Sequence, residues 1–382
     1  MSPHTISQAP HTVTMVGAAG LGVAHLIVDA VCVTSVLRAS PPSDALFSSA
    51  FAFVLGYDLL AFAGQAPFGW LTDRLGLRRG AALAGLLLTA AALLAGRAST
   101  LAVVLIAGAS NALFHVGAGA MVLAGSQGRA APAGVFVAPG ALGLGLGLLL
   151  GRKFLTVPMW PWLFAVAVAC VVVLLVANES PPSEEAEDAP PSAARPVFRR
   201  REIVGVAALL AVSVAVRSLA GTVGCDGCPR GFFLMLALPA AAFTGKLTGG
   251  FLADRFGWID LSMVALLASA PLLAFSGGDV WLALPGLMIF QMTMPVTLAA
   301  MMCLLPARPG FGFGLLCVAL VAGTLPAYLP GGWRPQGLAL FFLVLGSAAA
   351  LYLALRILLT PRRSRGVPAL ASGPSTLCGD NP

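Results

Sequence analysis

The stretch Gly69-Trp70-Leu71-Thr72-Asp73-Arg74-Leu75-Gly76-Leu77-Arg78-Arg79 decides the fold of this chain, and it closes a long apolar run. A near copy in the second half, Gly250-Phe251-Leu252-Ala253-Asp254-Arg255-Phe256-Gly257, closes another apolar run. An Asp-Arg pair between glycines suits a tight turn at a membrane surface. Glycine lets two helix ends approach closely, and the acid can bind arginines or helix N-termini. The repeat indicates a duplicated chain with two similar halves.

The composition is that of an all-α membrane protein. Hydrophobic residues make up 58% of the 382 residues and charged residues 10%, whereas soluble chains carry roughly 25% charged residues. A spanning helix needs about 20 apolar residues, and unpaired backbone groups do not lie in lipid. The apolar runs are continuous rather than alternating, which excludes a transmembrane β-barrel.

Twelve apolar runs are expected to span the bilayer. They cover residues 12–37, 46–70, 80–94, 101–124, 131–150, 160–177, 203–223, 232–252, 259–275, 281–305, 311–329 and 337–359. We therefore predict an N-terminal six-helix bundle (1–177), a solvated linker (178–202), a C-terminal six-helix bundle (203–360) and a disordered tail (361–382). Four prolines inside spans are expected to kink them: Pro139, Pro239, Pro295 and Pro326.

The net charge of +7 reflects orientation in the membrane. Lys and Arg lie mainly in short loops between apolar runs, which argues against a nucleic-acid partner. Most of these loops fall on one side if both termini are inside, so we predict cytoplasmic termini in a bacterial inner membrane, and a monomer. The other side holds only Arg38, Arg97, Arg152, Lys153, Arg230 and Arg334.

The doubled motif resembles the cytoplasmic signature of the major facilitator superfamily of transporters. The resemblance covers essentially the whole chain and implies two pseudo-symmetric six-helix bundles. It assigns a conformational latch to Gly69, Asp73, Arg74, Gly76, Arg78, Arg79, Gly250, Asp254, Arg255 and Gly257. The second copy lacks the trailing basic pair, because Ile259 and Asp260 occupy those positions, so we expect its latch to be the weaker one.

Shorter stretches resemble the fosmidomycin-resistance-like exporters within that superfamily. The matching stretches are His25-Leu26-Ile27-Val28-Asp29, Asn111-Ala112-Leu113-Phe114-His115, Gly140-Ala141-Leu142-Gly143, Arg217-Ser218 and Pro295-Val296-Thr297. The branch follows its histidine in span 4 with Pro-Glu, whereas Val116 and Gly117 follow His115 here. The resemblance implies proton-coupled efflux of a small drug-like or anionic compound.

Ionisable and polar side chains inside the spans are the candidate site. Each ionisable group near the bilayer centre costs at least about 2.5–3.5 kcal/mol, so each needs a reason to be there. The candidates for the substrate and proton pathway are His25, Asp29, Asp58, Asn111, His115, Arg217, Lys246 and Gln291. We expect Asp29, Asp58 and His115 to face Arg217 across a central cavity; the alternative is a fixed ion pair within one bundle, or snorkelling.

The function class that fits is a secondary transporter working by alternating access. No phosphate loop, dinucleotide fingerprint or metal-ligand cluster occurs, so we expect neither an enzyme nor a cofactor nor a metal. Two alternatives remain open: an uptake symporter for an organic anion, and a transporter-like sensor or assembly factor. For Cys225 and Cys228, a short-loop disulfide or two free thiols is favoured over a metal site.

Overall fold

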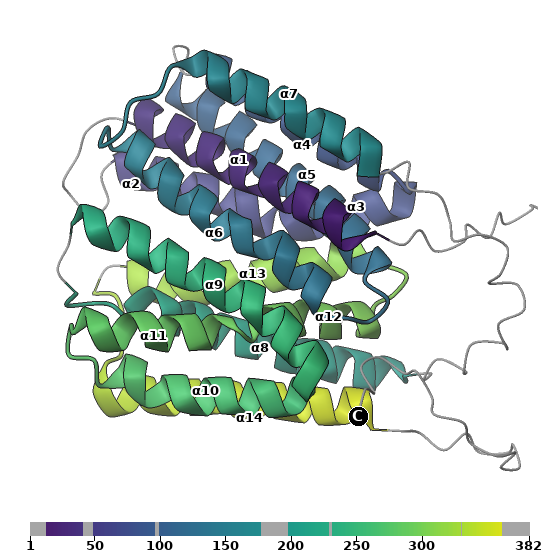
Figure 1. Ribbon diagram of the computed structural model, residues 1–382, viewed down its shortest axis with the longest axis vertical. Helices are drawn as coiled ribbons and strands as arrows, with labels where there is room; N and C mark the ends of the chain where they lie inside the picture. Colours follow the sequence, from purple (N-terminus) through teal and green to yellow (C-terminus); the bar gives the residue numbers. More distant parts are fainter. Residues whose placement is uncertain are drawn as a thin grey trace, which may run out of the picture.

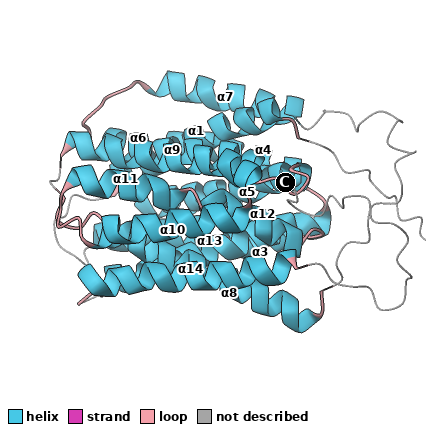
Figure 2. Ribbon diagram, turned by 60° about the horizontal axis from the view of Figure 1, so that its bottom comes forward, coloured by secondary structure: helices cyan, strands magenta, loops and turns pink. Residues whose placement is uncertain are grey.

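The computed structural model describes residues 13–40, 49–95, 99–176, 198–228, 231–329 and 331–360. Every element in these ranges is a helix, and Figure 2 shows only helices and their connections. Several predictions fall outside the described residues: the cytoplasmic N-terminal tail, most of the linker, the tail after residue 360, and the loop residues Arg97 and Arg230.

Helices of the first half occupy the upper part of Figure 1, and those of the second half the lower part. The first half contains α1 (Met15–Ala39), α2 (Ser49–Asp58), η1 (Leu59–Ala63), α3 (Gln65–Leu75), α4 (Arg78–Leu94), α5 (Thr100–Gly125), α6 (Ala131–Gly151) and α7 (Met159–Val176). The second half contains α8 (Arg200–Val223), α9 (Phe232–Phe256), α10 (Trp258–Ala274), α11 (Val280–Gln291), α12 (Met294–Leu304), α13 (Pro309–Tyr328) and α14 (Gly337–Leu359).

These helices account for twelve spans within the described residues. Nine segments are long and apolar enough to cross a membrane, with α11 and α12 counted as one. The shorter helices α4 and α10 each have 17 residues, and α2, η1 and α3 together form the remaining span. The predicted all-α fold with two six-helix bundles is confirmed. The second bundle begins at Arg200, slightly before the predicted boundary.

Each half packs mainly on itself, and two seams join the halves. In the first half α1 packs on α5, α6 and α7, and in the second half α14 packs on α8 and α10. One seam is the contact of α6 with α9, and the other is the contact of α13 with α3 and α5. The candidate site lies between these two seams.

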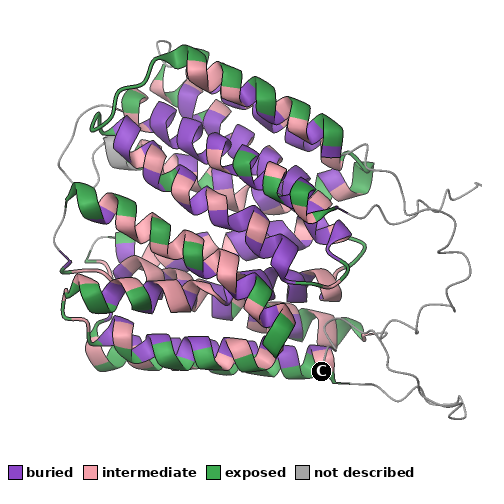
Figure 3. Cartoon of the chain, viewed as in Figure 1, coloured by how far each residue is buried: buried purple, intermediate pink, exposed green. Residues whose placement is uncertain are grey.

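The outward faces of the bundles are apolar and exposed. Figure 3 shows exposed residues along α7 and α14, while the buried residues lie between the helices. Large exposed side chains on these helices include Phe164, Leu175, Leu338 and Phe342. An apolar outer surface of this kind suits contact with lipid chains rather than water.

Two prolines explain why two spans are interrupted. Proline lacks an N–H and clashes with the carbonyl four residues earlier. That residue is Ala63 for Pro67 and Gln291 for Pro295, and η1 and α11 end at these two positions. The predicted kink at Pro295 is therefore a break, which turns Thr293 inward. By contrast, α6, α9 and α13 continue through their internal prolines.

Candidate functional site

Asp73, near the end of α3, binds the N-terminus of α13 in the other half. Its carboxylate accepts the N–H groups of Gly310 at 3.2 Å and Phe311 at 2.8 Å. The first N–H groups of a helix have no partner within the helix and carry partial positive charge, so a carboxylate is stabilised there. This contact, the first latch, fastens the two halves together at one end of the molecule.

The basic residues of the first motif copy divide their roles. The Nε of Arg78 lies 3.8 Å from Asp73, whereas the guanidinium of Arg74 lies 5.2 Å from the ring centre of Trp70. Burial raises the pKa of the Asp73 carboxyl, and the two backbone N–H groups and the Arg78 charge oppose that shift. The expected pairing of the acid with arginines therefore applies to Arg78 and not to Arg74.

Asp254 makes the equivalent contact with the N-terminus of α6. Its carboxylate accepts the N–H groups of Ala130 at 2.7 Å and Ala131 at 2.8 Å, and the indole N–H of Trp258 at 3.3 Å. Trp258 thus supplies a hydrogen-bond donor in place of the basic pair that this motif copy lacks. The backbone bonds of the second latch, at 2.7 and 2.8 Å, are no longer than those of the first, and the weaker second latch stays a prediction.

Glycine allows the closest approach between the halves. A Cβ placed on Gly69 would lie 2.2 Å from the carbonyl oxygen of Gly310, and one on Gly250 would lie 2.9 Å from that of Ala130. Backbone atoms cannot move aside as a flexible side chain can. The motif glycines are therefore required at both latches because the backbones touch there.

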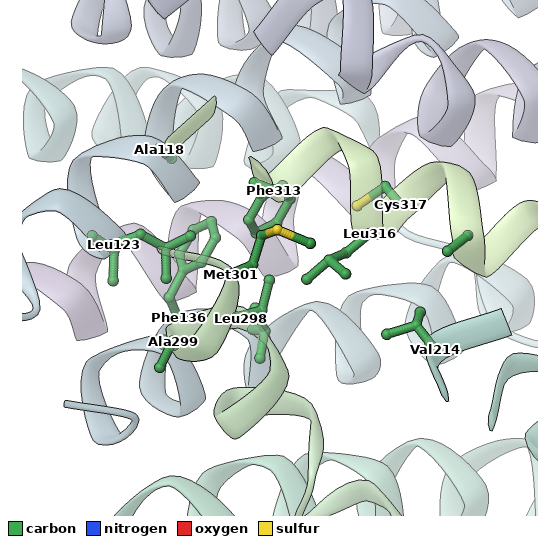
Figure 4. Packing of buried hydrophobic residues seen from close by; sticks show 14 of the residues in the cluster. Ala118, Leu123, Phe136, Val214, Leu298, Ala299, Met301, Phe313, Leu316 and Cys317 are labelled. Carbon is green, nitrogen blue, oxygen red and sulfur yellow. The ribbon is translucent and has the colours of Figure 1, made fainter. Parts of the chain in front are cut away.

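An apolar plug lies deeper between the halves, and Figure 4 shows its side chains. Phe313 of α13 lies with its ring centre 6.3 Å from that of Phe136 and 6.4 Å from that of His115, both in the first half. Met301 and Leu316 are buried in the same cluster. The plug and the two latches close one end of the molecule, which we call the latch end.

A cavity of about 710 Å³ lies between the halves. Its lining includes Arg152 and Phe154 after α6 and Gly231 before α9, at the end opposite the latches, and it reaches inward to Lys246 and Gln291. Binding sites for small molecules typically have volumes of roughly 300–1,000 Å³. The cavity is thus large enough for a small organic molecule.

Arg217 is the most deeply placed charge at this cavity. It is 6% exposed, and its guanidinium donates to the hydroxyls of Thr293 and Thr297 and to the carbonyl of Ser213. No acidic side chain of the described residues pairs with it. A buried cation held only by neutral acceptors is poorly compensated, so an anion entering the cavity would be attracted to it.

Two further candidates for the pathway, Lys246 and Gln291, also line the cavity, but Asp58 does not. Neither Lys246 nor Gln291 has a hydrogen bond or ion pair with another described residue. Asp58 is half-buried at the end of α2 and likewise has no such partner in the described part of the chain.

Asp29 belongs to a separate polar cluster inside the first half. It lies 3.2 Å from the Nε2 of His25 and 3.7 Å from that of His115. Asn111 donates its amide N–H to Asp29 at 2.7 Å and to the hydroxyl of Tyr57 at 3.3 Å. His25, Asp29 and His115 are the one group among the described residues whose ligand atoms are close enough to hold a metal ion, within 4.8 Å of one another.

The expected opposition of Asp29, Asp58 and His115 to Arg217 is not found. Asp29 and His115 bind partners in the first half, and Asp58 binds no described side chain. Arg217 instead binds threonines of α12 in its own half. The charge that Asp29 does attract from across the interface is Lys246. The alternative of a structural ion pair within one bundle therefore describes the geometry of Asp29 better.

Sequence reasoning missed the threonines that hold Arg217 and the aromatic plug. Thr297 belongs to one of the stretches that resemble the exporters, but nothing in the sequence indicated that its hydroxyl faces the guanidinium of Arg217. Only the break at Pro295 could have indicated that α12 turns hydroxyls inward. Cys225 and Cys228 form a disulfide, one of the two predicted states, and Cys225 lines the cavity.

No family model matches the chain, and no curated protein matches its sequence. Solved structures do match its fold. The E. coli fucose:proton symporter FucP matches at a TM-score of 0.62 and 16% identity, over 92% of this chain and 100% of that chain. A structure of FucP in the outward conformation matches at 0.62 and 14% identity, over 91% and 99% of the two chains.

The human organic anion transporter MFSD10 (TETRAN) matches at a TM-score of 0.56 and 18% identity, over 90% of this chain and 98% of that chain. Together these likenesses show that the chain has the fold of major facilitator superfamily transporters. They do not confirm the resemblance to the fosmidomycin-resistance-like branch.

Proposed function

We propose that this protein is a secondary transporter that carries a small organic anion across the membrane by alternating access. The observation that carries the proposal is the cavity between the two halves, which is closed at the latch end and continues towards the other end. Access at the latch end requires that two carboxylates leave two helix N-termini, that the close backbone contacts of Gly69 and Gly250 separate, and that the plug around Phe313 parts. Such few, directional contacts suit an interface that opens and closes repeatedly.

The charges of the cavity support an anion as cargo. Its described lining carries three basic side chains, Arg152, Arg217 and Lys246, and no acidic one. The other lining side chains are mostly apolar, as in Leu234, Leu238 and Phe290 of the second half. An organic anion with an apolar body fits both features. An organic anion is also the cargo named for human MFSD10, and a proton is named for FucP.

The proposal also covers the direction of transport and its coupling to protons. The resemblance to drug exporters predicts proton-coupled efflux by antiport, and the alternative predicts uptake of the anion with protons. We further propose a monomer in a bacterial inner membrane with both termini cytoplasmic, so that the cavity faces outward in this conformation. Export and uptake predict opposite responses of flux to the same pH gradient, which makes the direction measurable.

The proposal is tested by flux of radiolabelled benzenesulfonate into proteoliposomes, with and without an imposed pH gradient. This aryl anion is permanently ionised, so it does not cross lipid passively as a neutral acid. We expect protein-dependent flux that responds to the gradient, and a loss of about tenfold or more in Arg217→Gln, because a charge-assisted contact is removed. Neutral benzenesulfonamide should be carried poorly.

Arg334→Gln is the matched control. Arg334 pairs with Asp226 at 3.1 Å and is not part of the cavity lining, so this variant should transport like the wild type. Binding of benzenesulfonate without any flux would favour the sensor over the transporter. Equal benzenesulfonate flux in Arg217→Gln and the wild type would show that Arg217 is not the charge that binds the anion.

A further inference from the structure

His25 and His115 face each other through their Nε2 atoms, which lie 2.7 Å apart. The other ring nitrogens are also engaged. The Nδ1 of His25 lies 3.0 Å from the carbonyl oxygen of Phe136, and the Nδ1 of His115 lies 2.7 Å from that of Asn111. A carbonyl oxygen can only accept a hydrogen bond, so each Nδ1 must be the donor.

The two rings together make three contacts that each need one hydrogen. Two neutral imidazoles carry only two hydrogens on nitrogen, one per ring. Whichever tautomers are chosen, a neutral pair leaves one contact in which two lone pairs face each other. A third proton removes the conflict, because an imidazolium donates from both nitrogens. The geometry of the pair therefore corresponds to two rings with one extra proton.

Asp29 supplies the negative charge that balances this proton. Its two oxygens lie 3.2 Å from the Nε2 of His25 and 3.7 Å from that of His115. All three side chains are buried, with exposures of 5%, 3% and 4% for His25, Asp29 and His115. Without a cation, a carboxylate and two lone pairs would converge in a space that excludes water, which is strongly unfavourable.

The spacing identifies the cation. Two imidazole nitrogens bound to one transition-metal ion at about 2.0–2.1 Å in tetrahedral geometry stand roughly 3.3 Å apart. The separation of 2.7 Å between the Nε2 atoms is shorter than that and fits an N–H···N hydrogen bond. A proton rather than a metal ion suits the pair.

We propose that His25 and His115 share one proton between their Nε2 atoms, with Asp29 as its counter-ion, and that Lys246 links this site to the cavity. Lys246 projects from α9 of the other half, and its backbone carbonyl lies against Gly134 of α6, two residues before the Phe136 that contacts His25. From there its charge attracts Asp29 and repels positive charge on His115. Among the described residues, the remaining titratable groups around the cluster are Cys32, Tyr57 and Cys317. Thiols and phenols ordinarily titrate at about 8.5 and 10, so these three are uncharged at neutral pH.

The effect of the Lys246 charge on the shared proton has a definite sign, and its consequence for transport rests on the proposed function. Positive charge on Lys246 disfavours the shared proton. An anion that binds Lys246 offsets this charge and so strengthens proton binding, and by linkage the proton strengthens binding of the anion. Ligands that favour each other's binding occupy the protein together. The arrangement therefore favours the symporter alternative over antiport.

The test is nitrogen NMR of ¹⁵N-histidine-labelled protein in lipid, which needs no substrate. The chain has four histidines, so His4→Gln and His11→Gln in the full-length protein leave only the pair. At neutral pH we expect three of its four ring nitrogens to carry hydrogen. In Lys246→Met the third proton should persist to a pH higher by roughly one unit, and in Asp29→Asn it should be lost at a lower pH.

Lys153→Met is the matched control, because Lys153 is the other lysine of the chain and is exposed after α6. In Lys153→Met the histidine pair should lose its third proton at the same pH as in the protein that retains Lys153. Two protonated nitrogens at every pH, or a stoichiometric metal ion in elemental analysis, would overturn the shared proton. Identical titrations in Lys246→Met and Lys153→Met would overturn the link. Absent benzenesulfonate flux with the expected spectra would instead count against the proposed function alone.

Discussion

Asp73 and Asp254 each place a carboxylate on the first N–H groups of a helix in the opposite half. At the residue scale the two contacts differ only in their supporting donor, which is Arg78 for Asp73 and Trp258 for Asp254. The indole N–H of Trp258 therefore compensates for the basic pair that the second motif copy lacks. The two latches hold the halves with similar geometry although their sequences differ.

Both acids should stabilise the closed latch end. Asp73→Asn and Asp254→Asn each replace charge-assisted hydrogen bonds, which are worth about 1.5–3 kcal/mol, by weaker ones. We expect each variant to lower the ratio of closed to open latch ends about tenfold or more, measured as faster thiol labelling of a cysteine that replaces Met301, a buried residue of the plug. Because Asp260 is exposed in the first turn of α10, Asp260→Asn should label at the wild-type rate.

At the element scale, function depends on how closely α3 and α13 approach and on where spans are broken. The backbones of Gly69 and Gly310 touch, which sets the separation of the two helices at the first latch. The break between α11 and α12 turns Thr293 toward Arg217, and this places a buried cation at the cavity. A continuous helix would not present that hydroxyl in the same way.

Gly69→Ala should separate α3 from α13. The added Cβ would lie 2.2 Å from the carbonyl oxygen of Gly310, so we expect loss of the first latch and a lower melting temperature in detergent. Gly80→Ala is the control, since a Cβ there meets only Leu77 at 3.8 Å. That change should stabilise α4 by about 0.5–1 kcal/mol. Equal melting temperatures for the two variants would show that the close contact is unimportant.

At the scale of the whole molecule, the sequence was sufficient for the architecture but not for the pairing of charges. Continuous apolar runs and the doubled motif predicted two six-helix bundles, because span length and backbone satisfaction leave few alternatives in lipid. Which buried charges meet depends on helix rotation, and apolar runs without a polar face do not reveal it. The sequence therefore predicts that Asp29 faces Arg217, whereas in the structure Asp29 lies beside His25 and His115.

In each case the missing information was how one helix packs against another. Spacing of four placed His25 beside Asp29 on one helix face, but the approach of His115 depends on how α1 packs against α5. Pro295 indicated a kink, yet the identity of the groups exposed by the break could not be inferred. The latch partners were partly predictable, since the N–H groups of a helix N-terminus were among the expected donors to the acid.

The central claim, that the two ends of the cavity open alternately, is tested most directly by paired distance measurements with spin labels. In a cysteine-free background one label pair at Leu75 and Ala307 reports the latch end, and a second pair at Leu155 and Leu329 reports the opposite end; all four positions are exposed. Wild type is compared with the double variant Asp73→Asn, Asp254→Asn. Alternating access predicts that the variant lengthens the first distance and shortens the second. A longer latch-end distance with an unchanged or longer second distance would contradict it.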